Sequence, residues 1–321
     1  MRWILLTLGL FSTVVLACAI GQHALPLGQV LWALVGGEVP AEVATVVLDL
    51  RLPRVVLAGL VGAALSMAGA ALQGLFQNPL ADPHVLGISA GGALAAAVAL
   101  VLGQGVYVAA LPLWALVGSS LATLLVWRLG RVGRVMPLAG VLLAGVAVGL
   151  TLSALLSGVL LWARSQAGDV LLWLMGHLGG ATWGEVGAVA VCVVVGGGVL
   201  VYKALDLNAF LLGEEAAQSL GVAVESSKRW LLGGTALLVA GAVAFTGLIG
   251  FVGLIVPHAV RGWTGADHRR LLPAAAGVGA VVLILADLAA RSVVVGELPV
   301  GVLTGVVGGP FFLVLLRRRL G

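Results

Sequence analysis

The ionisable side chains of this sequence are few, and their scatter limits the chemistry they could perform. The five histidines lie on different loops and spans, so they form no cluster with Asp or Glu at one depth for metal or acid–base chemistry. The only lysines are Lys203 and Lys228, and neither follows the Gly-x-x-x-x-Gly of a phosphate-binding loop. The chain is therefore predicted to be no enzyme and no ATPase, with no metal site and no cofactor of its own.

Asp287 is the only carboxylate well inside an expected membrane span. Ion-coupled secondary transporters place ionisable groups inside the membrane, so this class is the alternative to an ATP-driven system. Asp287 also lies one helical turn before Arg291, and that spacing predicts an i,i+4 ion pair. Because little else could couple an ion gradient, the driving energy is expected from another subunit.

The composition places these residues in a membrane protein. Of 321 residues, 61% are hydrophobic and 9% are charged, whereas soluble domains carry about 25% charged residues. Only helices and closed barrels satisfy the backbone in lipid, and long uncharged runs without alternation exclude the barrel. The fold class is therefore all-α. The net charge of +4 does not indicate a nucleic-acid partner, because the basic residues are scattered over short loops.

A helical span needs about 20 mostly apolar residues. Runs of this kind predict a polytopic bundle of about ten transmembrane helices within a single permease domain, residues 1–321. The expected segments are Trp3–Ile20, Val55–Phe76, Val85–Leu102, Tyr107–Trp127, Leu138–Leu161, Val186–Tyr202, Trp230–Thr246, Gly247–Val260, Leu272–Ala290 and Gly301–Leu316. The Gly247–Val260 segment is too short to cross as a straight helix and is expected to be a buried half-length helix.

Charge sets the orientation of these spans. If the N-terminus is cytoplasmic and every segment crosses, the outside keeps only Arg51, Arg54, Arg164 and Arg291. This positive-inside bias predicts that both termini are cytoplasmic and that the protein lies in the bacterial inner membrane.

An internal match predicts two inverted-repeat halves. The segment Gly62–Ala70 aligns without gaps to Gly234–Ala242 and runs in the opposite direction in this topology. Antiparallel repeats are typical of transporters, although helices rich in Gly and Ala can also match by chance.

The largest expected cytoplasmic loop, within residues 203–228, has the pattern of two short helices. Asn208 can cap the first, Gly213 ends it, and a second runs from Glu214 to Gly221. Its apolar residues are unusual for a solvated loop and are expected to be exposed for docking to a partner: Phe210, Leu211, Leu212 and Leu220.

The same loop resembles that of a known family. Glu215-Ala216-Ala217-x-x-x-Gly221 is similar to the coupling motif of ABC importer permeases, without the Ile-x-Leu-Pro tail of the broader class. The surrounding residues resemble the cobalamin, ferric-siderophore and haem permease family, the membrane subunits of type II ABC importers. The residues predicted to couple to the ATPase are Leu212, Gly213, Glu214, Glu215, Ala216, Ala217, Ser219, Leu220 and Gly221. Further matching motifs run almost end to end.

The resemblance implies an assembly and a function. A homodimer of permeases in membrane lipid would carry two P-loop ATPase subunits, which hold ATP and Mg, and a periplasmic substrate-binding protein. Arg51, Arg54 and Arg291 would receive acidic residues of that binding protein; snorkelling to the interface is the simpler alternative.

The resemblance also implies that the substrate passes along the fifth span. The small residues Gly145, Gly149 and Ser153 would line this pathway without forming a tight binding site. His258 either shapes the gate or packs as a structural histidine. Met175 and His177, in the loop before the sixth span, are possible substrate contacts. The expected cargo is an iron chelate, with a ferric siderophore first, followed by haem or cobalamin.

Overall fold

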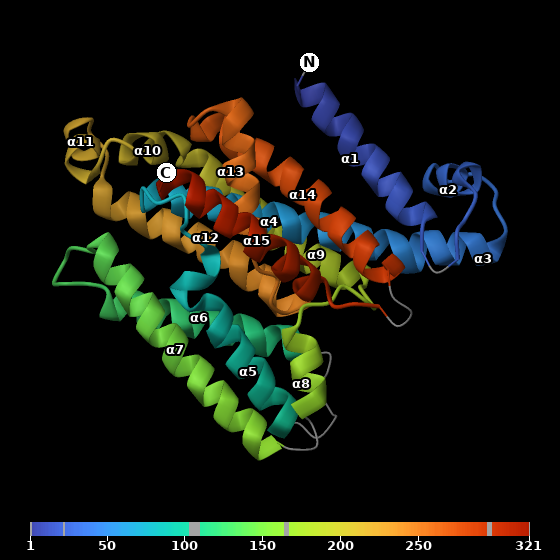
Figure 1. The fold of residues 1–321 in the computed structure, drawn as a ribbon, viewed down its shortest axis with the longest axis horizontal. Helices are drawn as coiled ribbons and strands as arrows, with labels where there is room; N and C mark the ends of the chain where they lie inside the picture. The colour runs from blue at the N-terminus through green and yellow to red at the C-terminus, as the bar shows by residue number, and fades with distance from the viewer. Residues whose placement is uncertain (1, 22, 103–109, 164–166, 294–296, 321) are drawn as a thin grey trace.

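The computed structural model describes residues 2–21, 23–102, 110–163, 167–293 and 297–320, and within them the chain is helical (Figure 1). The one β feature of these ranges is an isolated bridge between Val132 and Val135. The all-α prediction is therefore confirmed. Arg164 lies outside the described residues.

Each expected span corresponds to a helix. They are α1 (Arg2–Ala19), α4 (Leu52–Leu75), α5 (Ile88–Leu102), α6 (Leu111–Leu129), α7 (Leu138–Ala163), α9 (Trp183–Tyr202), α12 (Val224–Thr246), α13 (Val252–Thr264), α14 (His268–Val293) and α15 (Val300–Leu320). Seven helices of the described residues are long and apolar enough to cross a membrane, and α5 and α15 contain shorter apolar runs. The protein is thus a polytopic helical membrane protein; the number of crossings stays a prediction.

Several short helices were not expected from the sequence. They are α2 (Leu27–Leu34), α3 (Ala41–Ala44), the π-helical η1 (Thr45–Arg51), the 3₁₀ turn η2 (Pro83–Leu86) and α8 (Ala167–Leu174). None exceeds 8 residues, so a search for long apolar runs does not detect them.

Helix α4 forms the centre of the bundle and packs against α14, α13, α12 and α9. Small residues allow this close packing. A Cβ on Gly62 would lie 2.1 Å from the carbonyl oxygen of Gly279 on α14, and one on Gly69 would lie 1.8 Å from that of Gly253 on α13. Backbones that approach so closely leave no room for a side chain, as is common between membrane helices.

Helix α13 is a half-length helix, as expected, but its bounds differ from Gly247–Val260. Residues 247–251 are not helical, because Gly247 and Phe251 have φ of 70° and 67°. The helix begins at Val252 and has 13 residues, which corresponds to about 20 Å.

The bundle has two ends with different chemistry (Figure 1). The coupling end carries α10 (Ala204–Phe210), α11 (Glu214–Ser219) and the 130–137 turn between α6 and α7. The arginine end carries Arg51, Arg54 and Arg291. Helix α4 runs from the arginine end to the coupling end, and α12 runs back. The matching segments Gly62–Ala70 and Gly234–Ala242 therefore run in opposite directions, as inverted repeats require.

Candidate functional site

At the coupling end, α10 and α11 form the helix–turn–helix predicted from the sequence. Gly213 joins them with φ 103° and ψ 160°, a region of backbone space that is essentially restricted to glycine. Glu214 and Glu215 occupy the first turn of α11, where negative charge is favourable. Gly221, with φ 84°, ends the helix in a Schellman motif in which its N–H donates to Gln218 and that of Val222 donates to Ala217.

The surface of this helix pair presents leucines to its surroundings. Leu212 and Leu220 are 69% and 65% exposed, and Leu211 is also exposed. Phe210 was predicted to be exposed and is instead buried, at 1%. Its carbonyl accepts a hydrogen bond from Gln77 Nε2, just beyond α4. Phe210 therefore anchors the pair to the bundle, while the leucines remain available to a partner.

The prediction that Asn208 caps α10 is wrong, because Asn208 lies within the helix. Its Nδ2 donates to Asp267 Oδ1 at 2.7 Å, and its Oδ1 accepts from the backbone N–H of His268 at 2.8 Å. The hydrogen bonds that Asp267 accepts from Asn208 and from the Arg269 N–H lower the pKa of Asp267 below its usual value. Asn208 thus holds α10 on the start of α14.

A buried lysine fixes the other side of the helix pair. Lys228 is fully buried, and its ammonium donates to Glu214, to Glu225 Oε1 at 3.1 Å and to the Met136 carbonyl at 2.9 Å. Glu225 Oε2 accepts from the Met136 N–H at 2.9 Å. Lys228 therefore joins the start of α11, the start of α12 and the turn that precedes α7. Only the i,i+3 spacing of Glu225 and Lys228 was visible in the sequence.

At the arginine end, the three predicted docking residues lie together, and each has partners within the chain. Arg54 binds Asp287 through Nε at 3.0 and 3.1 Å and through Nη2 at 2.8 Å, and binds Glu297 through Nη1 at 2.9 Å. Arg291 Nε lies 3.6 Å from Asp287, which confirms the predicted i,i+4 pair. Arg51 donates to the carbonyl oxygens of Cys18 and Ala19.

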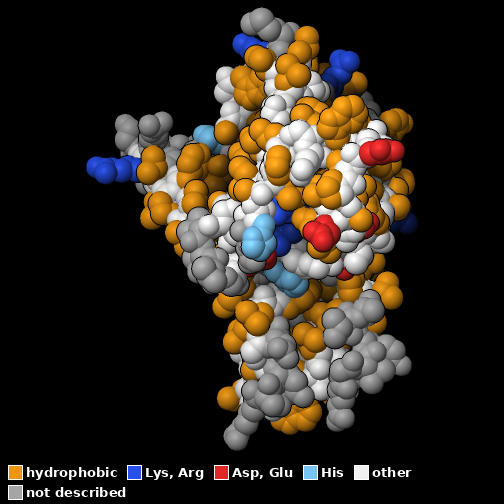
Figure 2. Space-filling view, turned by 90° about the vertical axis from the view of Figure 1, so that its right-hand side faces the viewer, with side chains coloured by type: hydrophobic (Ala, Val, Ile, Leu, Met, Phe, Trp, Pro, Cys, Tyr) orange, Lys and Arg blue, Asp and Glu red, His pale blue; other side chains and the backbone are white. Residues whose placement is uncertain are grey.

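The carboxylate between these arginines is almost completely buried. Asp287 is 1% exposed, and the side chains of Arg54 and Arg291 are 12% and 5% exposed. Glu297, at 39%, is the accessible member of the cluster. Figure 2 shows basic, acidic and histidine side chains gathered on this face among hydrophobic ones. Asp287 is therefore committed to two arginines.

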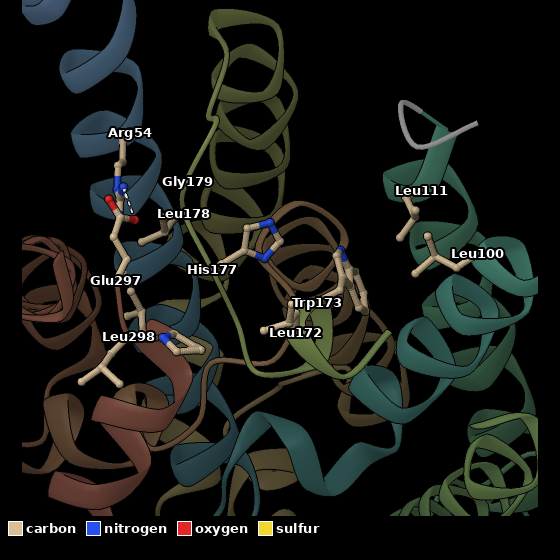
Figure 3. A pocket seen from close by; sticks show the side chains of 12 residues that line it. Arg54, Leu100, Leu111, Leu172, Trp173, His177, Leu178, Gly179, Glu297 and Leu298 are labelled. Atoms are coloured by element: carbon tan, nitrogen blue, oxygen red, sulfur yellow. Dashed lines mark hydrogen bonds and ion pairs between the residues drawn. The ribbon is translucent and has the colours of Figure 1, made fainter. Parts of the chain in front are cut away.

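A pocket of about 530 Å³ opens beside this cluster (Figure 3). Arg54, His177 and Glu297 provide its polar wall, and most of the remainder is apolar, including Trp173 and Leu178. The backbone N–H of His177 donates to the Thr246 carbonyl at 2.9 Å. Partial desolvation and the neighbouring Arg54 lower the pKa of the His177 imidazole below its ordinary value. A neutral imidazole at the pocket wall can accept a hydrogen bond or bind a metal.

The other predicted transport residues do not gather at one place. Met175 is 43% exposed and does not line this pocket. Gly145 and Gly149 face η2 and the start of α5, since a Cβ on Gly145 would lie 2.7 Å from the Val85 carbonyl. Ser153 is exposed on α7. His258 is half-buried on α13, which packs against α4 and α14 rather than α7. The roles of these residues in transport stay predictions.

Comparisons with known proteins define the family. The model of the FecCD transport family matches residues 7–318. The chain is 44% identical to the cobalamin import system permease protein BtuC of Halobacterium salinarum, over 88% of this chain and 76% of that protein. It is 43% identical to the hemin transport system permease protein HmuU of Yersinia pestis, over 85% and 83%. An inward-facing structure of a metal-chelate type ABC transporter superposes with a TM-score of 0.88 at 32% identity, covering 99% of this chain and 100% of that one.

These relatives are permease subunits, and a match over nearly the whole chain includes both the helix pair at the coupling end and the charged cluster at the arginine end. The chain is therefore a transport subunit rather than an enzyme, and it belongs to the FecCD transport family of ABC importer permeases.

Proposed function

We propose that this chain forms the membrane pathway of an ATP-driven importer that moves a metal chelate from the periplasm into the cytoplasm. The observation that carries the proposal is the helix pair α10–α11, which is rigidly held by Lys228 and Asn208 while Leu212 and Leu220 remain exposed. A helix pair fixed at its base and apolar at its tip suits docking into a groove of a separate ATPase. Two such ATPases would serve a homodimer, one for each permease.

The charged cluster argues against the ion-coupled alternative. A coupling carboxylate has to release and rebind a proton or a sodium ion during transport. Asp287 is buried, and both of its ionic partners are arginines of the same chain, Arg54 and Arg291. Its role is therefore structural, and energy from ATP hydrolysis on a partner remains the better account.

The proposed cargo is a metal chelate such as cobalamin or haem, because relatives that are 44% and 43% identical are named for cobalamin and hemin. The pocket beside Arg54 supports this class, since an apolar wall with a few polar groups suits a large amphipathic chelate. A ferric siderophore, expected from the sequence, stays a prediction.

The arginine end is proposed to receive the periplasmic binding protein. Acidic residues of that protein would compete with Glu297 for Arg54, because Glu297 is the accessible carboxylate of the cluster. Such an interaction would weaken with salt, as interactions between accessible charges do.

The proposal is tested by purifying the tagged permease in mild detergent and identifying the chains that copurify. A stoichiometric P-loop ATPase, with hydrolysis stimulated by a periplasmic binding protein, is the expected result. Leu212→Glu should abolish the association, whereas Val132→Glu should not, because Val132 is equally exposed at the same end but lies outside the helix pair. Equal association of both variants would contradict the docking role of α10–α11.

A further inference from the structure

Two adjoining hollows at the coupling end share one arginine. The first, of about 260 Å³, is lined by Arg131, Arg134, Met136, Glu225 and Arg229. The second, of about 530 Å³, is a mostly apolar groove that also includes Arg229. A basic hollow that continues into an apolar groove is complementary to an amphiphile. The anionic head would lie in the basic hollow and the apolar tail in the groove.

The basic hollow holds more positive than negative charge, with three arginines and one carboxylate in its lining. Both oxygens of Glu225 are already used, by Lys228 and by the Met136 N–H. Arg229 commits its Nε to the Glu225 carbonyl oxygen at 3.2 Å. No ion pair or side-chain hydrogen bond involves Arg131 or Arg134 in the described part of the chain. An anion placed here would meet three arginines with free donors, the arrangement that suits a phosphate group.

The apolar groove is built from the backbones of α9 and α12. Gly196 and Gly234 let these helices meet, since a Cβ on Gly196 would lie 2.8 Å from the Gly234 carbonyl oxygen. Gly233 has space beside it, and the groove there is also lined by Val195 on α9 and Trp127 on α6. Because most of the groove lining is apolar, an acyl chain would bury its methylene groups there.

The apolar groove carries two tryptophans in its lining. Trp127 and Trp230 line the groove, and Trp230 is 58% exposed. Tryptophans of membrane proteins concentrate at the level of the lipid headgroups. The groove is thus placed at the depth of the first methylenes of a lipid, and the arginines at the depth of its phosphate.

We infer that these two hollows form one binding site for an anionic phospholipid of the leaflet at the coupling end. The phosphate lies among Arg131, Arg134 and Arg229, and an acyl chain lies in the groove between α6, α9 and α12. Because Arg131 and Arg134 belong to the turn that Lys228 ties to α11 and α12, a lipid bound here would also brace the base of the coupling helix pair. The inference is independent of which chelate the importer carries.

The test uses the full-length permease in mild detergent, titrated with phosphatidylglycerol or phosphatidylcholine, with native mass spectrometry and thermal unfolding as readouts. Phosphatidylglycerol is expected to remain bound and to raise the unfolding temperature, and phosphatidylcholine is not. Each basic residue near an anionic headgroup contributes on the order of a fivefold gain in affinity. Replacing Arg131, Arg134 and Arg229 together by Gln should therefore weaken binding by roughly a hundredfold.

The matched control is Arg269→Gln with Arg270→Gln, which removes exposed arginines at the same end that do not line either hollow; its lipid binding should match the wild type. A second variant, Gly233→Leu, fills the groove, because only the Trp127 ring lies near that position, at 3.6 Å. It should weaken retention of phosphatidylglycerol while keeping the arginines.

Three results would overturn the inference. Inorganic phosphate alone could reproduce the full stabilisation, which would make this an ion site without a lipid. The two lipids could bind equally, or the triple Gln variant could bind phosphatidylglycerol as the control does. In either case the arginines would not select the headgroup.

Discussion

Replacing Asp287 by Asn should destabilise the protein far more than replacing Glu297 by Gln, although both carboxylates bind Arg54. Asp287 is 1% exposed and accepts three hydrogen bonds from Arg54, with Arg291 at 3.6 Å. Asparagine keeps the shape but removes the charge, so two buried guanidiniums lose their shared counter-ion. Breaking a buried ion pair in this way costs about 3–5 kcal/mol.

Glu297→Gln provides the matched control. Glu297 is 39% exposed and binds Arg54 through a single contact, so its loss should cost about 0–1 kcal/mol. Arg54 would retain its three hydrogen bonds to Asp287.

The assay is thermal unfolding of the purified permease in one detergent at one pH. Asp287→Asn should lower the midpoint by several degrees, and Glu297→Gln should change it little. A triple variant, Arg54→Met with Asp287→Leu and Arg291→Met, should recover much of the loss, because replacing a whole buried charged set by apolar residues is often neutral. Equal small shifts for both single variants would refute the claim that the buried Asp287 is the essential counter-ion of Arg54 and Arg291.

Three further predictions follow from local geometry. Gly213→Ala should reduce ATPase association, with a cost of about 1–3 kcal/mol, because its backbone lies in a region restricted to glycine; wild-type coupling in this variant would contradict that reasoning. Gly62→Ala should lower the unfolding temperature much more than Gly59→Ala, since the nearest atom to the added methyl lies at 2.1 Å in one case and 3.4 Å in the other. The imidazole of His177 should titrate below about 6.5, because desolvation and Arg54 lower its pKa. The neutral imidazole of His177 therefore stabilises the folded state above a pH of about 6.5, and this stabilisation is lost as the pH falls. A titration midpoint at or above about 6.5, measured for His177 by nitrogen-15 NMR, would exclude the lowered pKa.

The long helices were predictable because membrane spans depend on a local property, namely about 20 consecutive apolar residues. The helix pair α10–α11 was predictable for a similar reason, since Gly213, Glu214 and Gly221 each have a strong positional preference in a short helix. The buried face of that pair was not predictable in the same way. Phe210 and Leu212 look alike in the sequence, and only the position of α4 decides which is covered.

The charged contacts show the same limit more clearly. The pair of Asp287 with Arg291 follows from helical spacing, but the closer partner of Asp287 is Arg54, which is 233 residues away. Asn208 has the residue type of a helix cap, yet its side chain bonds to Asp267 and His268, 59 and 60 residues later. Contacts of this kind depend on how helices pack, and a single sequence carries no spacing that reports them.

The central claim, that ATP hydrolysis on a partner drives chelate import through this chain, is tested most directly by transport into proteoliposomes. The permease is reconstituted with its ATPase and binding protein, and uptake of labelled cobalamin, haem or ferric siderophore is followed with and without ATP. The expected result is uptake that requires ATP, that is lost in the Leu212→Glu variant and that persists when ionophores dissipate every ion gradient. Uptake that proceeds without the ATPase and stops when the proton or sodium gradient is dissipated would contradict the account.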